Sequence, residues 1–262
     1  DLPDIAIDDN PAMVRQKSRD FYWYSPVLKR QLDNIVAEAF ARPTSEAELV
    51  RLLGAAYRND VPVTVRGAGT GNYGQAVPLA GGLVIDVSLM KAVKHIGPGS
   101  VVCEPGAILA EIAVEAQKTG QELRLSPSTY HSASIGGFIA GGSGGVGSIR
   151  WGGLRDAGNI IRLRLALLDG PEPTVMELTG SDIAKASHAY GTTGVITEVE
   201  MPLAPTYAWV DVLMSFKALD KAVAFGEALA GADGLLLKNL SVVDHFVTPY
   251  FKRHKSFVRD GE

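Results

Sequence analysis

The chain has 262 residues, of which 46% are hydrophobic and 21% are charged, and its formal net charge is −4. This length allows one large domain or two smaller ones with real cores, and the composition is ordinary for a soluble globular protein. The acidic balance and the lack of lysine or arginine clusters exclude nucleic acid as an expected partner. No apolar run of about 18 residues occurs, and Cys103 is the only cysteine, so we expect a cytoplasmic protein without disulfides or a cysteine metal site.

Residues 1–36 are expected to form an irregular N-terminal arm. Aromatic residues gather beside a turn at 21–24. Packing of these rings on the domain surface is the simpler interpretation, and stacking on a ligand is the alternative.

The next stretch predicts strand, helix, strand over residues 35–66. Residues 35–40 read as a strand that ends before Pro43, and the spacing of Ser45 and Glu48 is that of a capping box. Leucines and alanines then recur at helical spacing up to residue 59, and 61–66 reads as a buried strand. Two strands joined by a helix predict a parallel pair.

A first glycine loop, Arg-Gly-Ala-Gly-Thr-Gly-Asn-Tyr-Gly, occupies residues 66–74. Its glycines satisfy G-x-G-x-x-G after a strand, but the Rossmann fingerprint also requires a helix at the loop. Residues 75–82 contain Pro78 and two glycines, so the Rossmann interpretation fails on context. A loop of consecutive backbone N–H groups remains, and such a nest suits a diphosphate. The absence of G-x-x-x-x-G-K-[ST] disfavours a nucleotide triphosphatase.

The segments that follow alternate between strands and helices. Strands are expected at 83–87 and 101–104, and a helix from residue 108 is expected to close at Gly120.

A second glycine stretch runs from residue 127 to residue 152. Seven of the sixteen residues 134–149 are glycine, yet large apolar residues are interspersed among them. This composition predicts a folded loop whose main chain approaches a ligand closely, and not a flexible linker.

Residues 160–205 predict further strands and a third glycine loop. A strand at 160–168 leads into an Asp-Gly hairpin turn at 169–170, and a short helix is expected at 182–189. The glycine turn at 191–197 enters a strand at 195–201, and Pro202 and Pro205 mark a boundary. Beyond this boundary we expect a strand at 208–216, a helix at 220–230 and a strand at 234–243.

The three glycine loops together resemble the FAD-binding domain of the vanillyl-alcohol oxidase and para-cresol methylhydroxylase superfamily. The motifs are Arg-Gly-x-Gly-Thr-Gly at 66–71, Pro-Ser-Thr at 127–129, Ser-Ile-Gly-Gly at 134–137, Gly-Gly-Val-Gly-Ser-Ile-Arg-Trp-Gly at 144–152 and Tyr-Gly-Thr-Thr-Gly-Val-Ile-Thr-Glu at 190–198. The resemblance implies an α+β FAD-binding domain of two subdomains over residues 37–205, with the flavin between them. It implies that residues 206–262 begin a ferredoxin-like substrate domain, which we expect to be incomplete.

The resemblance also implies which residues hold FAD. The first loop would wrap the diphosphate with its amides, the second would line the cofactor, and the third would hold the adenosine through main chain. The implied residues are Arg66, Gly67, Ala68, Gly69, Thr70, Gly71, Asn72, Pro127, Ser128, Thr129, Ser134, Ile135, Gly136, Gly137, Ala140, Gly144, Gly145, Val195 and Ile196. For Arg66, a surface salt bridge is the alternative.

The implied function is an FAD-dependent oxidoreductase that transfers a hydride from a 2-hydroxy acid or related alcohol to the flavin. Members with covalent FAD in the first loop carry histidine where this chain has Thr70, so we expect noncovalent FAD. We nominate no catalytic residue and no metal site, although His131 lies beside the second loop. A partner subunit or further chain is expected to complete the substrate domain and to cover its apolar residues Val242, Val243, Phe246, Val247 and Phe251. The electron acceptor is undefined.

Two other classes of function remain open. Gly141 to Gly145 fits the G-x-S-x-G motif of a serine hydrolase around Ser143, with His188 and either Asp156 or Asp169 as further triad members. That motif requires strand, sharp turn and helix, and no helical periodicity follows Gly145. The second alternative is an FAD-binding subunit or fragment without turnover of its own.

Overall fold

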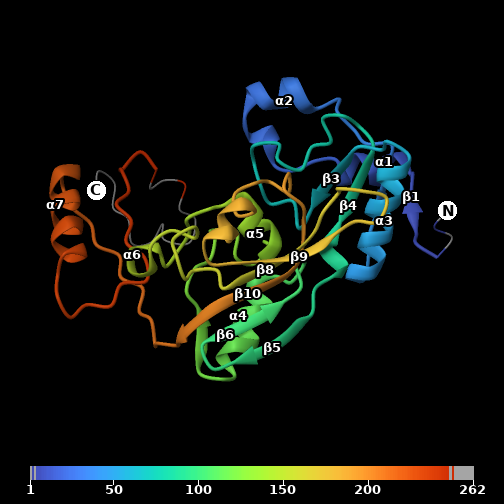
Figure 1. Ribbon diagram of the computed structural model, residues 1–262. Helices are drawn as coiled ribbons and strands as arrows, with labels where there is room; N and C mark the ends of the chain where they lie inside the picture. The colour runs from blue at the N-terminus through green and yellow to red at the C-terminus, as the bar shows by residue number, and fades with distance from the viewer. Residues whose placement is uncertain (1, 3, 248–249, 251–262) are drawn as a thin grey trace.

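Two β-sheets organise residues 2, 4–247 and 250, which are the residues that this computed structural model describes (Figure 1). The first sheet has the order β1-β2-β4-β3 and contains β1 (Ile7–Asp8), β2 (Ala39–Ala41), β3 (Val63–Arg66) and β4 (Leu83–Asp86). The second has the order β5-β6-β10-β8-β9 and contains β5 (Val93–Gly97), β6 (Ser100–Cys103), β8 (Arg162–Ala166), β9 (Val175–Thr179) and β10 (Val195–Pro205); β7 (Gln121–Leu123) pairs with the far end of β10. The predicted α+β class with two subdomains is confirmed.

The first sheet is a parallel unit with one antiparallel edge strand. Strands β2 and β3 both run parallel to β4, which lies between them, so the two predicted strands are parallel but do not pair with each other. Helix α3 (Glu46–Arg58) connects them. Ser45 Oγ accepts the backbone N–H of Glu48 at 3.3 Å, as the capping box predicts. The Glu48 carboxylate accepts the N–H of Thr44, the residue before the N-cap, and not that of Ser45 itself.

The second sheet carries the larger core. Helices α4 (Leu109–Gln117) and α5 (Ile135–Gly141) pack their buried residues on it, and Leu163, Leu165 and Val199 of the sheet are fully buried in the same cluster. Strands β8 and β9 form the hairpin predicted by Asp169-Gly170, and Asp169 Oδ1 accepts the N–H of Thr174 at 2.9 Å. The helix expected at 182–189 is instead the 3₁₀ helix η3 (Gly180–Lys185).

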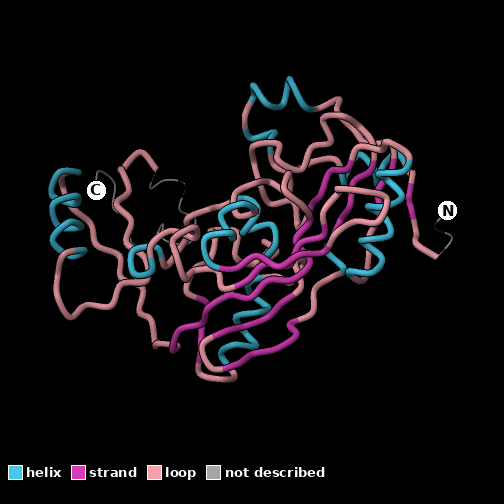
Figure 2. Tube along the Cα trace, in the orientation of Figure 1, coloured by secondary structure: helices cyan, strands magenta, loops and turns pink. Residues whose placement is uncertain are grey.

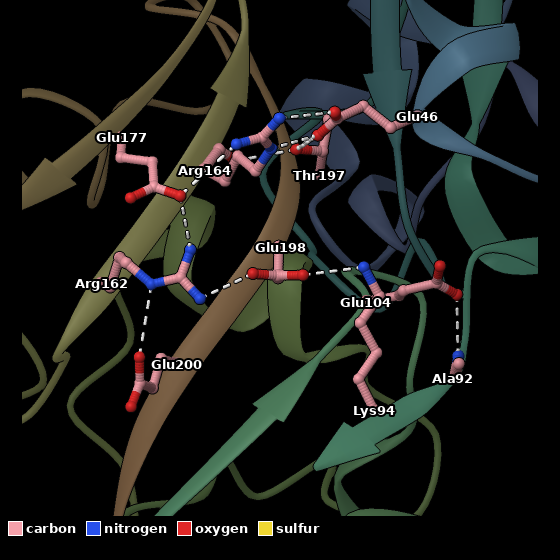
Figure 3. Close-up of polar contacts among 10 residues, drawn as sticks. All are labelled: Glu46, Ala92, Lys94, Glu104, Arg162, Arg164, Glu177, Thr197, Glu198 and Glu200. Carbon is pink, nitrogen blue, oxygen red and sulfur yellow. Dashed lines mark hydrogen bonds and ion pairs between the residues drawn. The ribbon is translucent and has the colours of Figure 1, made fainter.

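An ion-pair network joins the two subdomains (Figure 3). Arg164 of β8 makes two parallel hydrogen bonds to the Glu46 carboxylate of α3, at 2.7 and 3.0 Å, and Thr197 of β10 donates to the same carboxylate at 2.6 Å. The hydrogen bond from Arg164 lowers the pKa of Glu46. Two-pronged pairing of this kind fixes orientation as well as distance, so it holds α3 against the second sheet.

The N-terminal arm is not irregular, contrary to the sequence prediction. It contains α1 (Pro11–Lys17), the 3₁₀ helix η1 (Tyr22–Tyr24) and α2 (Pro26–Leu32). Both α-helices begin with a capping residue followed by proline, since Asn10 Oδ1 and Ser25 Oγ accept N–H groups of the first turn. These short start signals outweigh the weak helical periodicity of the arm.

The segment after β10 departs most from expectation. Residues 207–247 contain α7 (Leu219–Ala230), but neither strand expected at 208–216 and 234–243 forms within the described residues (Figure 2). Of the apolar residues expected to need a cover, Phe246 is 75% exposed and Phe251 lies outside the described residues. Among the residues that the structure describes, no helix is both long and apolar enough to cross a membrane.

Candidate cofactor site

A cleft between the two subdomains brings the first and third glycine loops together with α5. The empty space in this cleft, open solvent included, is about 880 Å³. Its lining comes from the loop after β3, from Ser134 and residues of α5, and from the loop that enters β10. Segments distant in sequence therefore converge on one site.

The first loop exposes main-chain donors to this cleft. Gly69 has φ +70°, and across the described residues no protein acceptor is assigned to the backbone N–H groups of Gly69, Thr70 and Gly71. A Cβ on Gly67 would lie 2.2 Å from Ser134 Oγ, so glycine is needed there for the first loop to approach Ser134 this closely. Consecutive free N–H groups around a left-handed residue form a nest, which fits a diphosphate without any side chain.

The second glycine stretch is a helix where a loop was predicted. Residues 135–141 form α5, Gly142 ends it at φ +68°, and α6 (Ser148–Trp151) follows. Ser134 is buried, and its Oγ accepts the N–H of Ala68 at 3.3 Å, which joins the helix start to the first loop. The glycines of this stretch thus serve close packing of a helix as well as approach to the cleft.

The third loop holds a histidine–tyrosine pair in an unusual backbone conformation. His188 and Tyr190 have φ +60° and +53°, and their N–H groups bond to the carbonyls of Ile139 and Ala140 in α5. His188 Nε2 lies 2.8 Å from Tyr190 Oη, and a Cβ on Gly142 would lie 2.3 Å from the His188 ring. Positive φ at non-glycine residues is strained and persists where surroundings enforce it. Tyr190 is among the residues that line the cleft.

Two charged residues, Asp20 and Arg66, line the cleft. Asp20 is 5% exposed, and its Oδ1 accepts the N–H of Tyr22 at 2.8 Å. Burial raises the pKa of the Asp20 carboxyl. Arg66 does not form the surface salt bridge considered from the sequence, because its Nη1 donates to the backbone carbonyls of Lys17 and Arg19 at 2.6 and 2.8 Å.

The predicted cofactor residues divide into those that line the cleft and those that do not. The lining residues are Arg66, Gly67, Ala68, Gly69, Thr70, Gly71, Ser134, Gly136, Gly137, Ala140, Val195 and Ile196. The predicted residues outside the lining are Asn72, Pro127, Ser128, Thr129, Ile135, Gly144 and Gly145. Ile135 belongs to the core, and Gly145 packs on the Ser126 carbonyl, where a Cβ would lie 2.3 Å away.

Sequence reasoning missed other residues of the lining. These are Asp20, Val65, Gln75, Ala76, Val87, Pro105, Gly141, Ala186, Tyr190, Gly191, Thr193 and Gly194. Those from Tyr190 to Gly194 lie inside the third motif, which was therefore a sufficient signal. Nothing in the local sequence connects Asp20 with a loop some fifty residues later.

The residues of the alternative serine-hydrolase interpretation do not form a catalytic triad. Ser143 is exposed and lies outside the cleft lining, and His188 Nε2 is bonded to Tyr190. A short helix, α6, does follow Gly145, contrary to the sequence prediction, but α5 and not a strand precedes Ser143. His131 is exposed and outside the lining, and the described residues contain no cluster of metal-ligating side chains.

Fold and cleft define a domain that binds a diphosphate-containing cofactor between two subdomains, and sequence comparison identifies the domain. Residues 37–172 match the family described as FAD binding domain, so the chain belongs to this family and its cofactor is FAD. The match ends before the third loop and β10, which complete the cleft.

The relatives are FAD-linked oxidoreductases and hydroxy-acid dehydrogenases. The chain is 31% identical to an uncharacterized FAD-linked oxidoreductase of Mycobacterium tuberculosis, over 78% of this chain and 46% of that protein. It is 29% identical to the glycolate oxidase subunit GlcD of Escherichia coli, over 78% of this chain and 42% of the relative. It is 33% identical to the mitochondrial D-lactate dehydrogenase (cytochrome) of Arabidopsis thaliana, over 62% of this chain and 29% of the relative. The chain thus spans less than half the length of these curated relatives.

A solved structure has the same fold. An alkyldihydroxyacetonephosphate synthase superimposes with a TM-score of 0.67 at 22% identity, over 78% of this chain and 39% of that chain. This likeness supports the two-subdomain architecture alone.

Proposed function

We propose that this chain is the cofactor-binding part of an FAD-dependent oxidoreductase that oxidises a 2-hydroxy acid or related alcohol. The observation that carries the proposal is the convergence of the first and third glycine loops on one cleft, in a chain of an FAD-binding family. The names of its relatives, which include glycolate oxidase and D-lactate dehydrogenase, indicate the substrate class.

When bound, FAD supplies the acceptor for a hydride from the carbinol carbon. The residues of this chain have binding and orienting roles. The N–H groups of Gly69, Thr70 and Gly71 would hold the diphosphate, while Val195 and Ile196 would contact the adenosine through main chain. No residue of the chain is assigned as the base that takes the hydroxyl proton, and we expect that group in the substrate domain.

We propose that the cofactor is held without a covalent bond. Thr70 has no nucleophilic ring nitrogen, and Cys103 is buried and outside the cleft lining. Burial raises the pKa of the Cys103 thiol to about 12, so the reactive thiolate is disfavoured. Acid precipitation of the yellow protein should release FAD, and not FMN, into the supernatant. Flavin that stays on the precipitated chain would contradict this proposal.

The alternative is an FAD-binding subunit or fragment without its own turnover. Two observations favour it. One relative is named as a glycolate oxidase subunit, and this chain spans only 42% of that relative's length. The partner chain and the cytoplasmic location stay predictions, and the electron acceptor is undefined.

The test is anaerobic bleaching of bound FAD by a panel of 2-hydroxy acids. It compares this chain with a longer product that also carries the substrate domain. Bleaching by the longer product alone supports a division of labour in which this chain holds only the cofactor. Failure of both to bleach, while dithionite reduces the flavin, would refute the proposed substrate class and leave FAD binding intact.

A further inference from the structure

Residues 10–33 of the N-terminal arm contact the first glycine loop. Arg66 Nη1 donates to the carbonyls of Lys17 and Arg19, which follow one another around the end of α1, at 2.6 and 2.8 Å. The backbone N–H of Phe21 donates to the Gly71 carbonyl at 2.8 Å. The loop is therefore tied to the arm, and one arm residue, Asp20, itself lines the cofactor cleft.

Gly69 permits the contact with Arg66. A Cβ at Gly69 would lie 1.9 Å from Arg66 Nη2, and its φ of +70° suits glycine. The loop accordingly wraps around the guanidinium: Nε and Nη2 donate to the loop carbonyls of Gly67 and Ala68 at 3.4 Å, and Nη1 donates to the arm carbonyls. Burial lowers the pKa of Arg66, whereas the nearby Asp86 and Asp20 favour its charged form; arginine stays charged throughout.

A third tie joins the arm to the sheet beneath the loop. Lys17 Nζ lies 2.5 Å from Asp86 Oδ2, and the Asp86 side chain is 1% exposed. Asp86 is the register partner of Arg66 across β3 and β4. Burial raises the pKa of Asp86, but the hydrogen bonds from Lys17 and Ser88 outweigh it, so its net pKa is lowered. Lys17 itself does not line the cleft.

We propose that the arm and the first glycine loop form one cooperative unit, in which Arg66 and Lys17 are positioning residues, so that arm docking and FAD binding strengthen each other. The inference rests on the proposal that this loop binds the FAD diphosphate. A loop held in its binding conformation loses less conformational freedom when the ligand arrives. Linkage then requires that FAD strengthen arm docking by the same factor by which the docked arm strengthens FAD binding.

The first experiment compares Lys17→Met with Lys29→Met by fluorescence titration with FAD. Both variants remove one positive charge from the arm, but Lys29 pairs with Asp33 at the surface. We expect Lys17→Met to weaken FAD binding by about tenfold or more, since its partner carboxylate is buried. Lys29→Met should stay within about twofold of the wild type. Equal FAD affinity in both variants would overturn the proposal.

A double variant separates loss of the tie from general instability. Lys17→Met leaves the Asp86 charge buried and unpaired, which is itself destabilising. Lys17→Met with Asp86→Asn removes that charge and keeps an acceptor for the Ser88 N–H, so the melting temperature of the apoprotein should largely recover. We expect the weakened FAD binding to persist. Recovery of both quantities would show a purely structural role and refute the proposal.

The reciprocal effect is measured on the wild-type chain, so the test does not depend on whether a variant folds. Trypsin cleavage after Arg15, Lys17 or Arg19 requires the arm to open. We expect saturating FAD to slow these cleavages by about the factor found for Lys17→Met, with cleavage at surface sites elsewhere unchanged. Equal cleavage rates with and without bound FAD would refute the coupling. Retention of FAD affinity in Gly71→Val would instead refute the loop as diphosphate site, which keeps the two failures distinct.

Discussion

The predicted FAD-binding region, residues 37–205, and the segment 207–247 are both rich in apolar residues but have different structures. In β10, the central strand of the second sheet, Val199 is fully buried between β6 and β8. At 208–216 the apolar residues are more frequent than in β10, yet Val210 is 79% exposed and the backbone makes no strand. Two partner strands flank β10, whereas among the described residues none pairs with 208–216. The comparison shows that an apolar pattern becomes a strand only where partner strands lie beside it.

The segment is nevertheless held to the FAD-binding region at defined points. Glu122 accepts Trp209 Nε1 at 3.0 Å and pairs with Lys238 Nζ at 3.2 Å. The Lys238 carbonyl accepts the N–H of Gly147 at 2.9 Å. We propose that the rest of a longer chain, or a partner subunit, supplies the missing strands, because the relatives are more than twice as long as the part matched here.

Core truncation tests the contrast most strongly. Leu163→Ala removes a fully buried side chain of β8, and we expect a loss of about 2–5 kcal/mol in the free energy of unfolding. Val210→Ala should change it by less than about 0.5 kcal/mol. Urea denaturation measures both. A comparable loss for Val210→Ala would mean that the segment 207–247 has a packed core of its own.

Two glycines with similar backbone angles give the next test. A Cβ at Gly69 would meet Arg66 Nη2 at 1.9 Å, whereas Gly234, at φ +78°, has nothing within 4 Å. We expect Gly69→Ala to lower FAD affinity about a hundredfold and Gly234→Ala to leave it unchanged, since the latter adds only local strain of about 1 kcal/mol. Titration of the apoproteins with FAD measures this. Full affinity in Gly69→Ala would show that the loop rearranges freely.

The ion pair between subdomains should matter less than the core but more than a surface pair. Arg164→Ala removes the two-pronged contact with Glu46, and we expect a loss of about 1.5–3 kcal/mol in unfolding free energy. Lys118→Ala breaks an exposed pair with Glu115 one helical turn away and should have little effect. Thermal unfolding of the two variants measures the difference. Equal melting temperatures for Arg164→Ala and Lys118→Ala would show that Glu46 is well solvated without its partner.

The smallest effect concerns the pH dependence of stability. Burial holds the pKa of Asp20 above its unfolded value, so its stabilising contribution is complete below the unfolded pKa and is lost as pH rises through the folded pKa. Asp20→Asn removes this dependence and should therefore raise stability at neutral pH relative to acidic pH. Asp233→Asn, at an exposed site of the segment after β10, is the control. If the dependence of stability on pH became flatter in Asp233→Asn but not in Asp20→Asn, its attribution to Asp20 would be wrong.

Local sequence signals determined much of the fold. Ser45 and Glu48 begin α3 because capping depends on residues three apart, and short apolar runs bounded by turn residues located β3, β4, β8 and β10. The glycine spacing of 66–71 predicted a loop at the cleft wall, since positive φ and close main-chain approach demand glycine at fixed positions. These features follow from interactions within a few residues.

Other features were decided only by contacts between distant parts of the chain. Arg66 was a predicted cofactor residue, yet its guanidinium bonds to carbonyls of the arm, whose helices were themselves unexpected. The His188–Tyr190 pair depends on space left by Gly142. The stretch 208–216 satisfies the local pattern of a strand but has no partner in the described chain. A backbone hydrogen-bond ladder and a buried polar contact both require a second segment of the chain. Local sequence patterns do not identify which distant segment that is.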